Sequence, residues 1–301
     1  MNGALEGKVA IVTGAGRGIG RCVAEELAAN GARVVVNDAN VSLSGKTESQ
    51  DPAQEVVAGI KSAGGDAVLV TESVATFDGG ERIVQAALDS FGRLDIVVTA
   101  AGILRDRMIY NMTEEEWDAV LQVHLYGAFN MVRNAIPHMV DSRYGRIVLF
   151  SSGSGMGASG QANYAAAKEG IVGFTRALAS FGITVNAVYP GGATRMTESV
   201  PQSTRELRQQ QRTAAAASTG ATAAAPGMAA QRAPIEGPEE ARAPENNAPK
   251  VAYLCTEAGG SITGQVIGTS GWQMTLYSPR HVTKSIHKSG RWTLDELDQL
   301  I

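Results

Sequence analysis

The sequence contains little cysteine and no excess of positive charge. Cys22 and Cys255 are the only cysteines among 301 residues. Both lie in stretches with a helical pattern, which favours free thiols in a reducing cytoplasm over the alternative of one disulfide. Acidic residues outnumber basic residues by 30 to 26, and the formal net charge is −4. This balance excludes the basic composition that is typical of nucleic-acid-binding proteins.

Long apolar runs are also missing. None approaches the roughly 20 residues that are needed to cross a bilayer. Residues 1–6, MNGALE, lack the basic and apolar regions of a secretory signal. Residues 298–301, DQLI, are not a peroxisomal address. We therefore expect no membrane partner and, by default, a cytoplasmic location.

The sequence does contain a regular alternation of short apolar runs and helical patterns. Strands are expected at residues 8–13, 33–36, 66–71, 94–99, 145–150, 183–188 and 265–268. Helices are expected at residues 21–30, 52–63, 80–91, 113–138, 161–181, 250–255 and 293–301. This order predicts an α/β fold: a single-domain, Rossmann-type, doubly wound parallel sheet of about seven strands. Residues 1–280 would form this domain, and residues 281–301 would form a tail with a short helix.

A glycine-rich turn joins the first expected strand to the first expected helix. Residues 14–20 read GAGRGIG. Glycines let the backbone approach a diphosphate closely, and the helix N-terminus offers unpaired N–H groups and a positive dipole. The order strand, turn, helix favours dinucleotide binding over a merely tight turn. The expected cofactor residues in this turn are Gly14, Gly16, Arg17, Gly18, Ile19 and Gly20.

Asp38 follows the second expected strand, about twenty residues after the glycine turn. A carboxylate there can accept hydrogen bonds from both ribose hydroxyls of an adenosine, and it would repel a 2′-phosphate. The pattern therefore favours NAD over NADP as the cofactor. Arg17 favours NADP instead, because a guanidinium in the glycine turn can attract that phosphate. A turn-capping role for Asp38 is the plainer alternative.

Tyr164 and Lys168 lie four residues apart in a run of good helix formers. They therefore share one helix face, one turn apart. A nearby ammonium favours the phenolate form of tyrosine, so this tyrosine can exchange a proton with an alcohol or a carbonyl near neutral pH. By themselves, the two residues are equally compatible with an exposed lysine beside a half-buried tyrosine.

Other candidate residues follow the central strands. The small residues Ala100, Ala101 and Gly102 would leave room for a flat ring, or would simply allow close packing. Ser152 follows the fifth strand, where open α/β sheets place ligand contacts. In the expected helix 113–138, which has a capping-box start, His124 falls on the apolar face, where a buried core histidine is the default interpretation.

The composition changes sharply between residues 201 and 249. This segment is rich in alanine, glutamine and proline, and it has too few large apolar residues to form its own core. We interpret residues of about 197–249 as a flexible lid, partly helical over 203–217, rather than as a linker between domains.

Taken together, these motifs resemble the short-chain dehydrogenase/reductase family. The resemblance is carried by residues 13–20, Ser152, residues 164–168 and residues 190–191, over some 250 residues. It implies that Tyr164 is the general acid/base, that Lys168 binds the nicotinamide ribose, and that Ser152 hydrogen-bonds the substrate oxygen. It further implies cofactor contacts from Ser73, Val74, Ala100, Ala101, Gly102, Tyr164, Lys168, Pro190, Gly191 and Thr194, and no metal.

A narrower similarity is to the (3R)-hydroxyacyl-CoA dehydrogenase part of peroxisomal multifunctional enzyme type 2 and its bacterial relatives. It is carried by residues 37–38, 103–107, 123–125, 160–164, 195–197, 243–249 and 270–272. It does not cover residues 200–232 or the tail after Arg280.

The sequence departs from the family pattern in four places. His124 replaces an asparagine that helps a water relay, although the narrower group also has histidine there, which places His124 among the catalytic candidates. Residues 99–102 read TAAG where the family has NNAG, and Ser73 replaces an aspartate that touches adenine. The loop before Tyr164 is one residue short, so Ser151 competes with Ser152 for the catalytic position.

The resulting expectation is an NAD-dependent enzyme that acts on a secondary alcohol or ketone, and possibly on a (3R)-hydroxyacyl thioester. Cyclic alcohols or steroids are the alternative substrates, because the lid touches the substrate. A dinucleotide-binding scaffold without chemistry is a third interpretation. We expect a homodimer or homotetramer assembled through helices 113–138 and 161–181.

Overall fold

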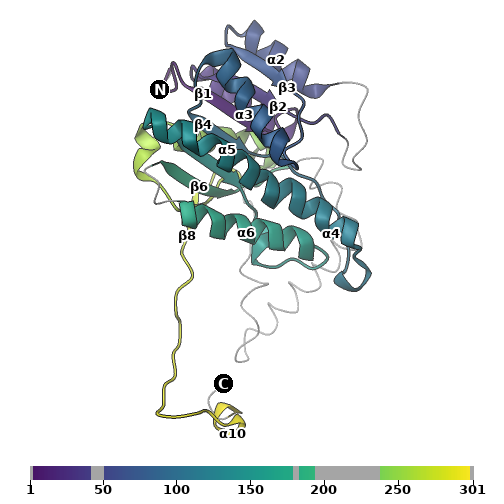
Figure 1. Ribbon diagram of the computed structural model, residues 1–301, viewed down its shortest axis with the longest axis vertical. Helices are drawn as coiled ribbons and strands as arrows, with labels where there is room; N and C mark the ends of the chain where they lie inside the picture. Colours follow the sequence, from purple (N-terminus) through teal and green to yellow (C-terminus); the bar gives the residue numbers. More distant parts are fainter. Residues whose placement is uncertain (1–2, 42–50, 179–182, 194–237, 299–301) are drawn as a thin grey trace.

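The computed structural model describes residues 3–41, 51–178, 183–193 and 238–298. Its centre is a sheet of eight strands in the order β3-β2-β1-β4-β5-β6-β7-β8 (Figure 1). The strands are β1 (Val9–Thr13), β2 (Arg33–Asn37), β3 (Ala67–Val70), β4 (Ile96–Thr99), β5 (Arg146–Phe150), β6 (Thr184–Tyr189), β7 (Val266–Gly268) and β8 (Thr275–Tyr277). Neighbouring strands pair in parallel up to β7, and β8 pairs with β7 antiparallel. The predicted fold is confirmed, with one short antiparallel strand more than the expected seven.

Helices pack on both faces of this sheet. They are α1 (Gly18–Ala29), α2 (Pro52–Ser62), α3 (Phe77–Phe91), α4 (Glu114–Leu121), α5 (Gly127–Ser142), α6 (Ala162–Leu178) and α9 (Ala248–Leu254). A further short helix, α10 (Leu294–Asp298), lies apart from the sheet. Apolar side chains of α1, α2 and α9 join one core, and those of α3, α5 and α6 join the other. In Figure 1, α3, α5 and α6 lie together on the near side of the sheet.

Successive residues of each strand point into opposite cores. In β1, Ala10 and Val12 belong to the core under α1, whereas Val9 and Ile11 belong to the core under α3 and α5. All four are fully buried. A strand that is covered on both faces must be apolar at every position, which is why the strands appear in the sequence as continuous runs.

The order of the strands reverses between β1 and β4. From β1 the chain winds outward to β2 and β3, and α3 then brings it back to β4 on the other side of β1. Beyond the carboxyl ends of two such strands the connections diverge and leave a crevice, which is where open α/β sheets bind ligands.

The helix that was expected over residues 113–138 has a more complex form. It begins as predicted, with Thr113 and Glu116 forming a reciprocal capping box. After α4 it widens into a π-helical turn at Gln122–Tyr126 and then continues as α5 to Ser142. The apolar periodicity located the helix correctly but did not indicate the π turn, because one inserted residue barely disturbs the pattern.

The C-terminal third departs most from expectation. The end of the predicted lid, residues 238–249, packs on the body, since Ala241 and Asn247 are fully buried; residues 194–237 lie outside the described part. Helix α10 begins after Thr293, as predicted. Cys22 and Cys255 are both free thiols. Within the described ranges, no helix is both long enough and apolar enough to span a membrane.

Candidate active site

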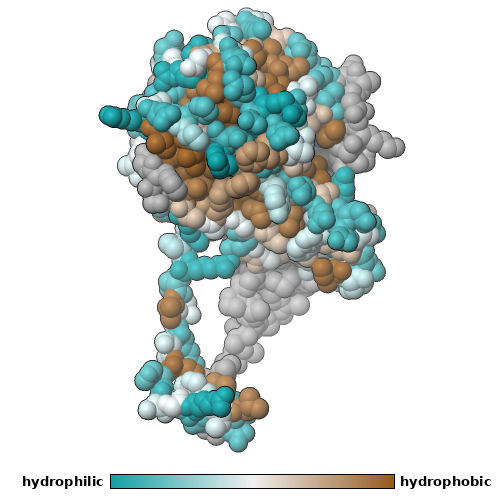
Figure 2. All heavy atoms as spheres, in the orientation of Figure 1, coloured by the Kyte–Doolittle hydropathy of each residue, from teal (hydrophilic) through white to brown (hydrophobic). Residues whose placement is uncertain are grey.

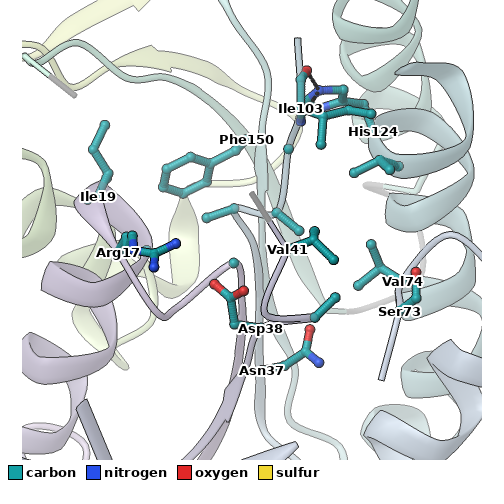
Figure 3. A pocket seen from close by; sticks show the side chains of 18 of the residues that line it. Arg17, Ile19, Asn37, Asp38, Val41, Ser73, Val74, Ile103, His124 and Phe150 are labelled. Atoms are coloured by element: carbon teal, nitrogen blue, oxygen red, sulfur yellow. Dashed lines mark hydrogen bonds between the residues drawn. The ribbon is translucent and has the colours of Figure 1, made fainter. Parts of the chain in front are cut away.

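A cavity of about 410 Å³ opens at the carboxyl ends of the central strands (Figure 3). It lies where the strand order reverses between β1 and β4. Most of the predicted site residues line it, namely Gly14, Arg17, Gly18, Ile19, Gly20, Asp38, Ser73, Val74, Ala100, Ala101, Gly102, His124, Tyr164, Lys168 and Pro190. Residues from seven separate segments of the sequence therefore meet in one crevice.

Three predicted residues do not line the cavity, and a fourth lies outside the described residues. Gly16 is not among the lining residues, and it donates its N–H to Asp38. Gly191 exchanges two hydrogen bonds with the side chain of Asn247. Ser152 is buried next to the cavity but does not line it. Thr194 lies outside the described residues.

The glycine turn packs too closely on its neighbours to carry side chains. Gly14 has φ +65°, and a Cβ atom there would lie 2.6 Å from the backbone nitrogen of Ala101. A Cβ atom on Gly20 would overlap the carbonyl oxygen of Gly14. The bare backbone at the start of α1 thus faces the cavity, which fits a diphosphate. A nucleotide cofactor therefore fits the residues that are present.

Asp38 and Asn37 organise the wall at the end of β2. The carboxylate of Asp38 accepts the N–H groups of Gly16 and Asn40, each at 3.0 Å. The amide of Asn37 donates to the carbonyl oxygens of Val70 at 3.0 Å and Glu72 at 2.9 Å. This dipeptide therefore holds together the glycine turn, the end of β2 and the end of β3. Figure 3 shows Asp38 and Arg17 near one another at this end of the pocket.

Tyr164 and Lys168 reach the cavity from α6. Lys168 is 4% exposed, and its Nζ donates to the carbonyl oxygen of Phe150 at the end of β5. The Nζ atom lies 5.5 Å from the centre of the Tyr164 ring. Burial lowers the pKa of Lys168 from 10.5 to about 7. The predicted pair is thus brought together in the cavity wall, and its cation is desolvated.

Ser151 and Ser152 have different hydrogen-bond roles. The hydroxyl of Ser151 donates to the carbonyl oxygen of Lys168 at 2.6 Å, and this bond uses its single proton. The hydroxyl of Ser152 accepts the N–H of Ser154 at 3.1 Å and keeps its proton for another acceptor. Ser151 lines the cavity and Ser152 lies beside it. The available proton therefore favours Ser152 as the donor to a substrate oxygen, although Ser151 is the serine that lines the cavity.

His124 sits in the π-helical turn and is 4% exposed. Its Nε2 lies 2.8 Å from the carbonyl oxygen of Ile103, and its ring meets the Tyr164 ring edge-on at a centroid distance of 5.0 Å. Burial holds the pKa of His124 well below 6.5, and the nearby charge of Lys168 acts in the same direction. Its Nδ1 has no hydrogen-bond partner among the described residues. The imidazole is therefore neutral, and it contacts the catalytic candidate.

Several lining residues were not predicted. They are Asn37, Ala39, Val41, Glu72, Ile103, Val123 and Phe150, with Ser151 considered only as an alternative. Most of them directly neighbour a predicted residue at the carboxyl end of a strand. Their position at strand ends could have identified them, because every strand end on this edge of a parallel sheet faces the same crevice.

Comparisons with known proteins agree with this geometry. The short chain dehydrogenase family model matches residues 8–205. A hydroxyacyl-CoA dehydrogenase of Mycobacterium tuberculosis is 38% identical over 97% of this chain and 87% of its own length. The peroxisomal multifunctional enzyme type 2 of mouse is 46% identical over 65% of this chain, which spans only 27% of that enzyme.

A solved structure supports the same relationship over nearly the whole chain. The crystal structure of a short chain dehydrogenase from Mycobacterium avium superposes with a TM-score of 0.78 and 37% identity. The match covers 99% of this chain and 94% of the other. The chain therefore belongs to the short-chain dehydrogenase/reductase family and is an oxidoreductase that uses an NAD(P) cofactor to interconvert small-molecule alcohols and ketones.

Proposed function

We propose that the protein is an NAD-dependent dehydrogenase that acts on (3R)-hydroxyacyl thioesters. The observation that carries the proposal is the meeting of Tyr164 and Lys168 with the glycine turn and Asp38 in one cavity. The thioester is supported by the names of the mycobacterial and mouse relatives, which are a hydroxyacyl-CoA dehydrogenase and a peroxisomal multifunctional enzyme.

In this proposal, Tyr164 moves the proton. NAD, when bound, would be held by the glycine turn and Asp38 and would supply the acceptor for a hydride from the substrate carbon. As the alcohol is oxidised, its oxygen loses a proton to the phenolate oxygen of Tyr164, and in the reverse direction the phenol returns it. A positioned general acid or base of this kind accelerates a reaction by about 10² to 10⁴.

Lys168 and Ser152 support that proton transfer. The ammonium of Lys168 lies 5.5 Å from the Tyr164 ring, so its charge favours the phenolate. Ser152, whose proton is available, donates to the substrate oxygen as negative charge develops on it. The neutral ring of His124 packs against Tyr164 and limits its movement.

The preference for NAD is proposed on electrostatic grounds. Asp38 lines the cavity with its carboxylate held by two backbone N–H groups. A fixed negative charge there accepts hydrogen bonds from ribose hydroxyls and repels a 2′-phosphate. Arg17 lines the same end of the cavity and is the residue that opposes this preference.

Replacing Tyr164 with phenylalanine tests the chemistry. Tyr164→Phe keeps the ring that packs against His124 and removes only the hydroxyl. We expect turnover to fall at least about a hundredfold, because the proton has no other carrier, while NAD binding changes little. Turnover and NAD affinity are measured by nicotinamide absorbance and calorimetry. Tyr110→Phe, at a side chain that is 76% exposed, is the matched control. Comparable turnover by Tyr164→Phe would refute the assignment.

The substrate class is tested separately with the unmodified protein. NAD reduction is compared on a (3R)-hydroxyacyl-CoA, its (3S) isomer, simple cyclic alcohols and hydroxysteroids. The proposal expects the (3R) thioester to have the highest kcat/KM. Activity on the alcohols or steroids with none on either thioester would refute the proposed substrate class but would be consistent with the proposed mechanism.

We further infer that the chain forms a homodimer or homotetramer through α4, α5 and α6. Two observations support this. Helix α5 exposes Phe129 and Val140. Helix α6 presents Gly173, where a Cβ atom would meet no other atom within 4 Å, so the backbone of a second copy can approach closely.

A further inference from the structure

Asn247 is a fully buried amide side chain next to an apolar core. It ends the short 3₁₀ turn Pro244–Asn247, directly before α9. Its neighbours Ala248 and Val251 belong to the apolar core that α9 shares with α1. A buried amide lowers the stability of the fold unless its polar atoms are hydrogen-bonded. The proposed chemistry gives Asn247 no role, so its presence here needs another reason.

Every hydrogen-bonding position of this amide is used. Its Oδ1 atom accepts the N–H of Gly191 at 3.3 Å and the hydroxyl of Thr269 at 2.8 Å. Its Nδ2 atom donates to the carbonyl oxygen of Gly191 at 2.9 Å and to that of Pro244 at 3.0 Å. A side-chain amide has two lone pairs on oxygen and two N–H groups, so the set is complete. Asn247 therefore binds three separate backbone segments at once.

Gly191 needs this partner because the sheet ends before it. The ladder between β6 and β7 stops at the pair Tyr189 and Gly268. Gly191 is buried, so its N–H and carbonyl groups cannot be satisfied by bulk water. The amide of Asn247 exchanges with them the two hydrogen bonds that a neighbouring peptide group would make. One side chain thus extends the hydrogen bonding of the sheet beyond the end of β6.

The backbone that Asn247 holds belongs to the catalytic end of the cavity. Pro190, the residue before Gly191, lines the cavity. It follows β6, which lies next to β5, and the last residue of β5, Phe150, accepts the hydrogen bond of the Lys168 ammonium. The glycine turn and Asp38 follow β1 and β2, on the other side of β4 in the strand order. A dinucleotide with its diphosphate and adenosine at those residues has only its nicotinamide half left for the end at Pro190.

The two segments also fit closely at a second point. The N–H of Ala193 donates to the carbonyl oxygen of Arg242 at 2.7 Å. Between the two contacts, a Cβ atom on Gly192 would lie 3.3 Å from that same oxygen and 3.3 Å from the Cα atom of Pro244. Residues 190–193 therefore take their position from residues 242–247, and the Asn247 amide is the side chain that joins them.

We propose that Asn247 is a positioning residue, which holds Gly191 and thereby sets the backbone of Pro190 against the nicotinamide half of the cofactor. This inference rests on the nucleotide site of the proposed function and concerns only how its reactive half is held. The alternative is a purely structural role, in which Asn247 stabilises the fold and does not affect the cofactor. The two roles differ in their effect on ADP-ribose, which keeps the adenosine, the diphosphate and the second ribose but lacks the nicotinamide ring.

Asn247→Asp tests the proposal in the full chain. Aspartate has nearly the same shape but no N–H groups, so the carbonyl oxygens of Gly191 and Pro244 lose their donor. We expect the Kd for NADH to rise about tenfold, because this backbone is no longer fixed, while the Kd for ADP-ribose changes less than about twofold. Calorimetric titration measures both, with circular dichroism as a check of folding. Thr269→Val is the matched control, because it removes one bond to the same Oδ1 atom and keeps the Gly191 pair; both Kd values should stay within about twofold of wild type.

Three outcomes of this titration count against the proposal. Equal weakening of both ligands by Asn247→Asp, or weakening of neither, would assign a purely structural role. Wild type that binds neither ligand would refute the proposed cofactor, and this proposal with it. Neither ligand is a thioester, so an error in the proposed substrate class would not change the result.

A second measurement uses the unmodified protein and needs no variant to fold. Hydrogen exchange is followed by mass spectrometry in peptides that cover residues 189–193 and 242–247, with saturating NADH or saturating ADP-ribose. The proposal expects NADH to slow the exchange of the Gly191 and Ala193 N–H groups at least about threefold more than ADP-ribose does, because only NADH carries the ring that this backbone contacts. Equal protection by the two ligands would contradict the proposal.

Discussion

Lys168 carries its charge where water has been excluded. Its side chain is 4% exposed, and its ammonium donates to the carbonyl oxygen of Phe150. Burial favours the neutral amine, so the pKa falls from 10.5 to about 7. Between these two values the unfolded chain binds more protons than the folded chain, so the free energy of unfolding rises with pH. Below pH 7 both states are protonated, and the cost of burying the charge is constant.

The variant Lys168→Met tests this linkage. It removes the titrating group but keeps an apolar stem of similar length. We expect the free energy of unfolding of wild type, minus that of the variant, to rise by up to about 1.4 kcal/mol per pH unit between pH 7 and about 10. Urea unfolding of both proteins at a series of pH values measures this difference in the free energy of unfolding. Lys61→Met, at an exposed position on α2, controls for the loss of one lysine. A flat difference would show that Lys168 is not desolvated as described.

Asp38 is the residue on which the proposed cofactor preference depends. The variant Asp38→Ala removes the charge that repels a 2′-phosphate and leaves Arg17 to attract it. The ratio of kcat/KM for NAD to kcat/KM for NADP should fall about tenfold, which corresponds to about 1.4 kcal/mol. Asp66→Ala removes an equal charge from an exposed position before β3 and should leave the ratio unchanged. An unchanged ratio in Asp38→Ala would show that another residue selects the cofactor.

Two elements meet at the π-helical turn. The segment that leaves β4 passes under this turn, and a Cβ atom on Gly102 would overlap the Cε1 atom of His124. His124 in turn contacts the carbonyl oxygen of Ile103 at 2.8 Å. The extra residue of the π turn therefore places one imidazole against both the loop after β4 and Tyr164. Single π turns of this kind are frequent at functional sites.

Gly102→Ala tests the fit between these elements. The added methyl group displaces the His124 ring, so we expect a loss of about 1–3 kcal/mol in the free energy of unfolding and weaker NAD(P) binding. In the His124→Asn background, Gly102→Ala should lower the free energy of unfolding by less, because asparagine has a smaller side chain than histidine. Gly59→Ala is the control, because a Cβ atom there meets nothing within 4 Å on α2. Equal costs in both backgrounds would show that His124 is not what excludes a side chain at position 102.

Assembly is a property of the whole molecule. Figure 2 shows apolar and polar side chains mixed over the body, with brown patches between the teal ones. The proposed interface on α6 includes Gly173, where an added Cβ atom would meet nothing within 4 Å. The same is true of Gly59 on α2, which lies outside the proposed interface. Gly173→Arg should block the approach of a second copy and yield a smaller species by light scattering, because a long cation replaces a bare backbone. Gly59→Arg should remain assembled. Equal masses for both variants would exclude α6 from the interface.

The strands and most helices could be predicted because their signals are local. A strand that is buried on both faces must be apolar throughout, as in residues 8–13, and the capping box at Thr113 marks a helix start within four residues. β8 could not be predicted because three residues carry no period. It forms because β7 offers an edge to pair with and because the Tyr277 ring meets the Tyr189 ring edge-on. The π turn was missed because one extra residue in a long helix leaves no trace in the apolar pattern.

The sequence by itself determined the order of the elements, the glycine turn, and the pairing of Tyr164 with Lys168, because each depends on residues close together in the chain. Only the tertiary structure decided that Ser151 donates its proton to the carbonyl oxygen of Lys168, that Asn37 joins the ends of β2 and β3, and that His124 is neutral. Those properties depend on burial and on partners far away in the sequence, and these exist only once the sheet has brought its strand ends together.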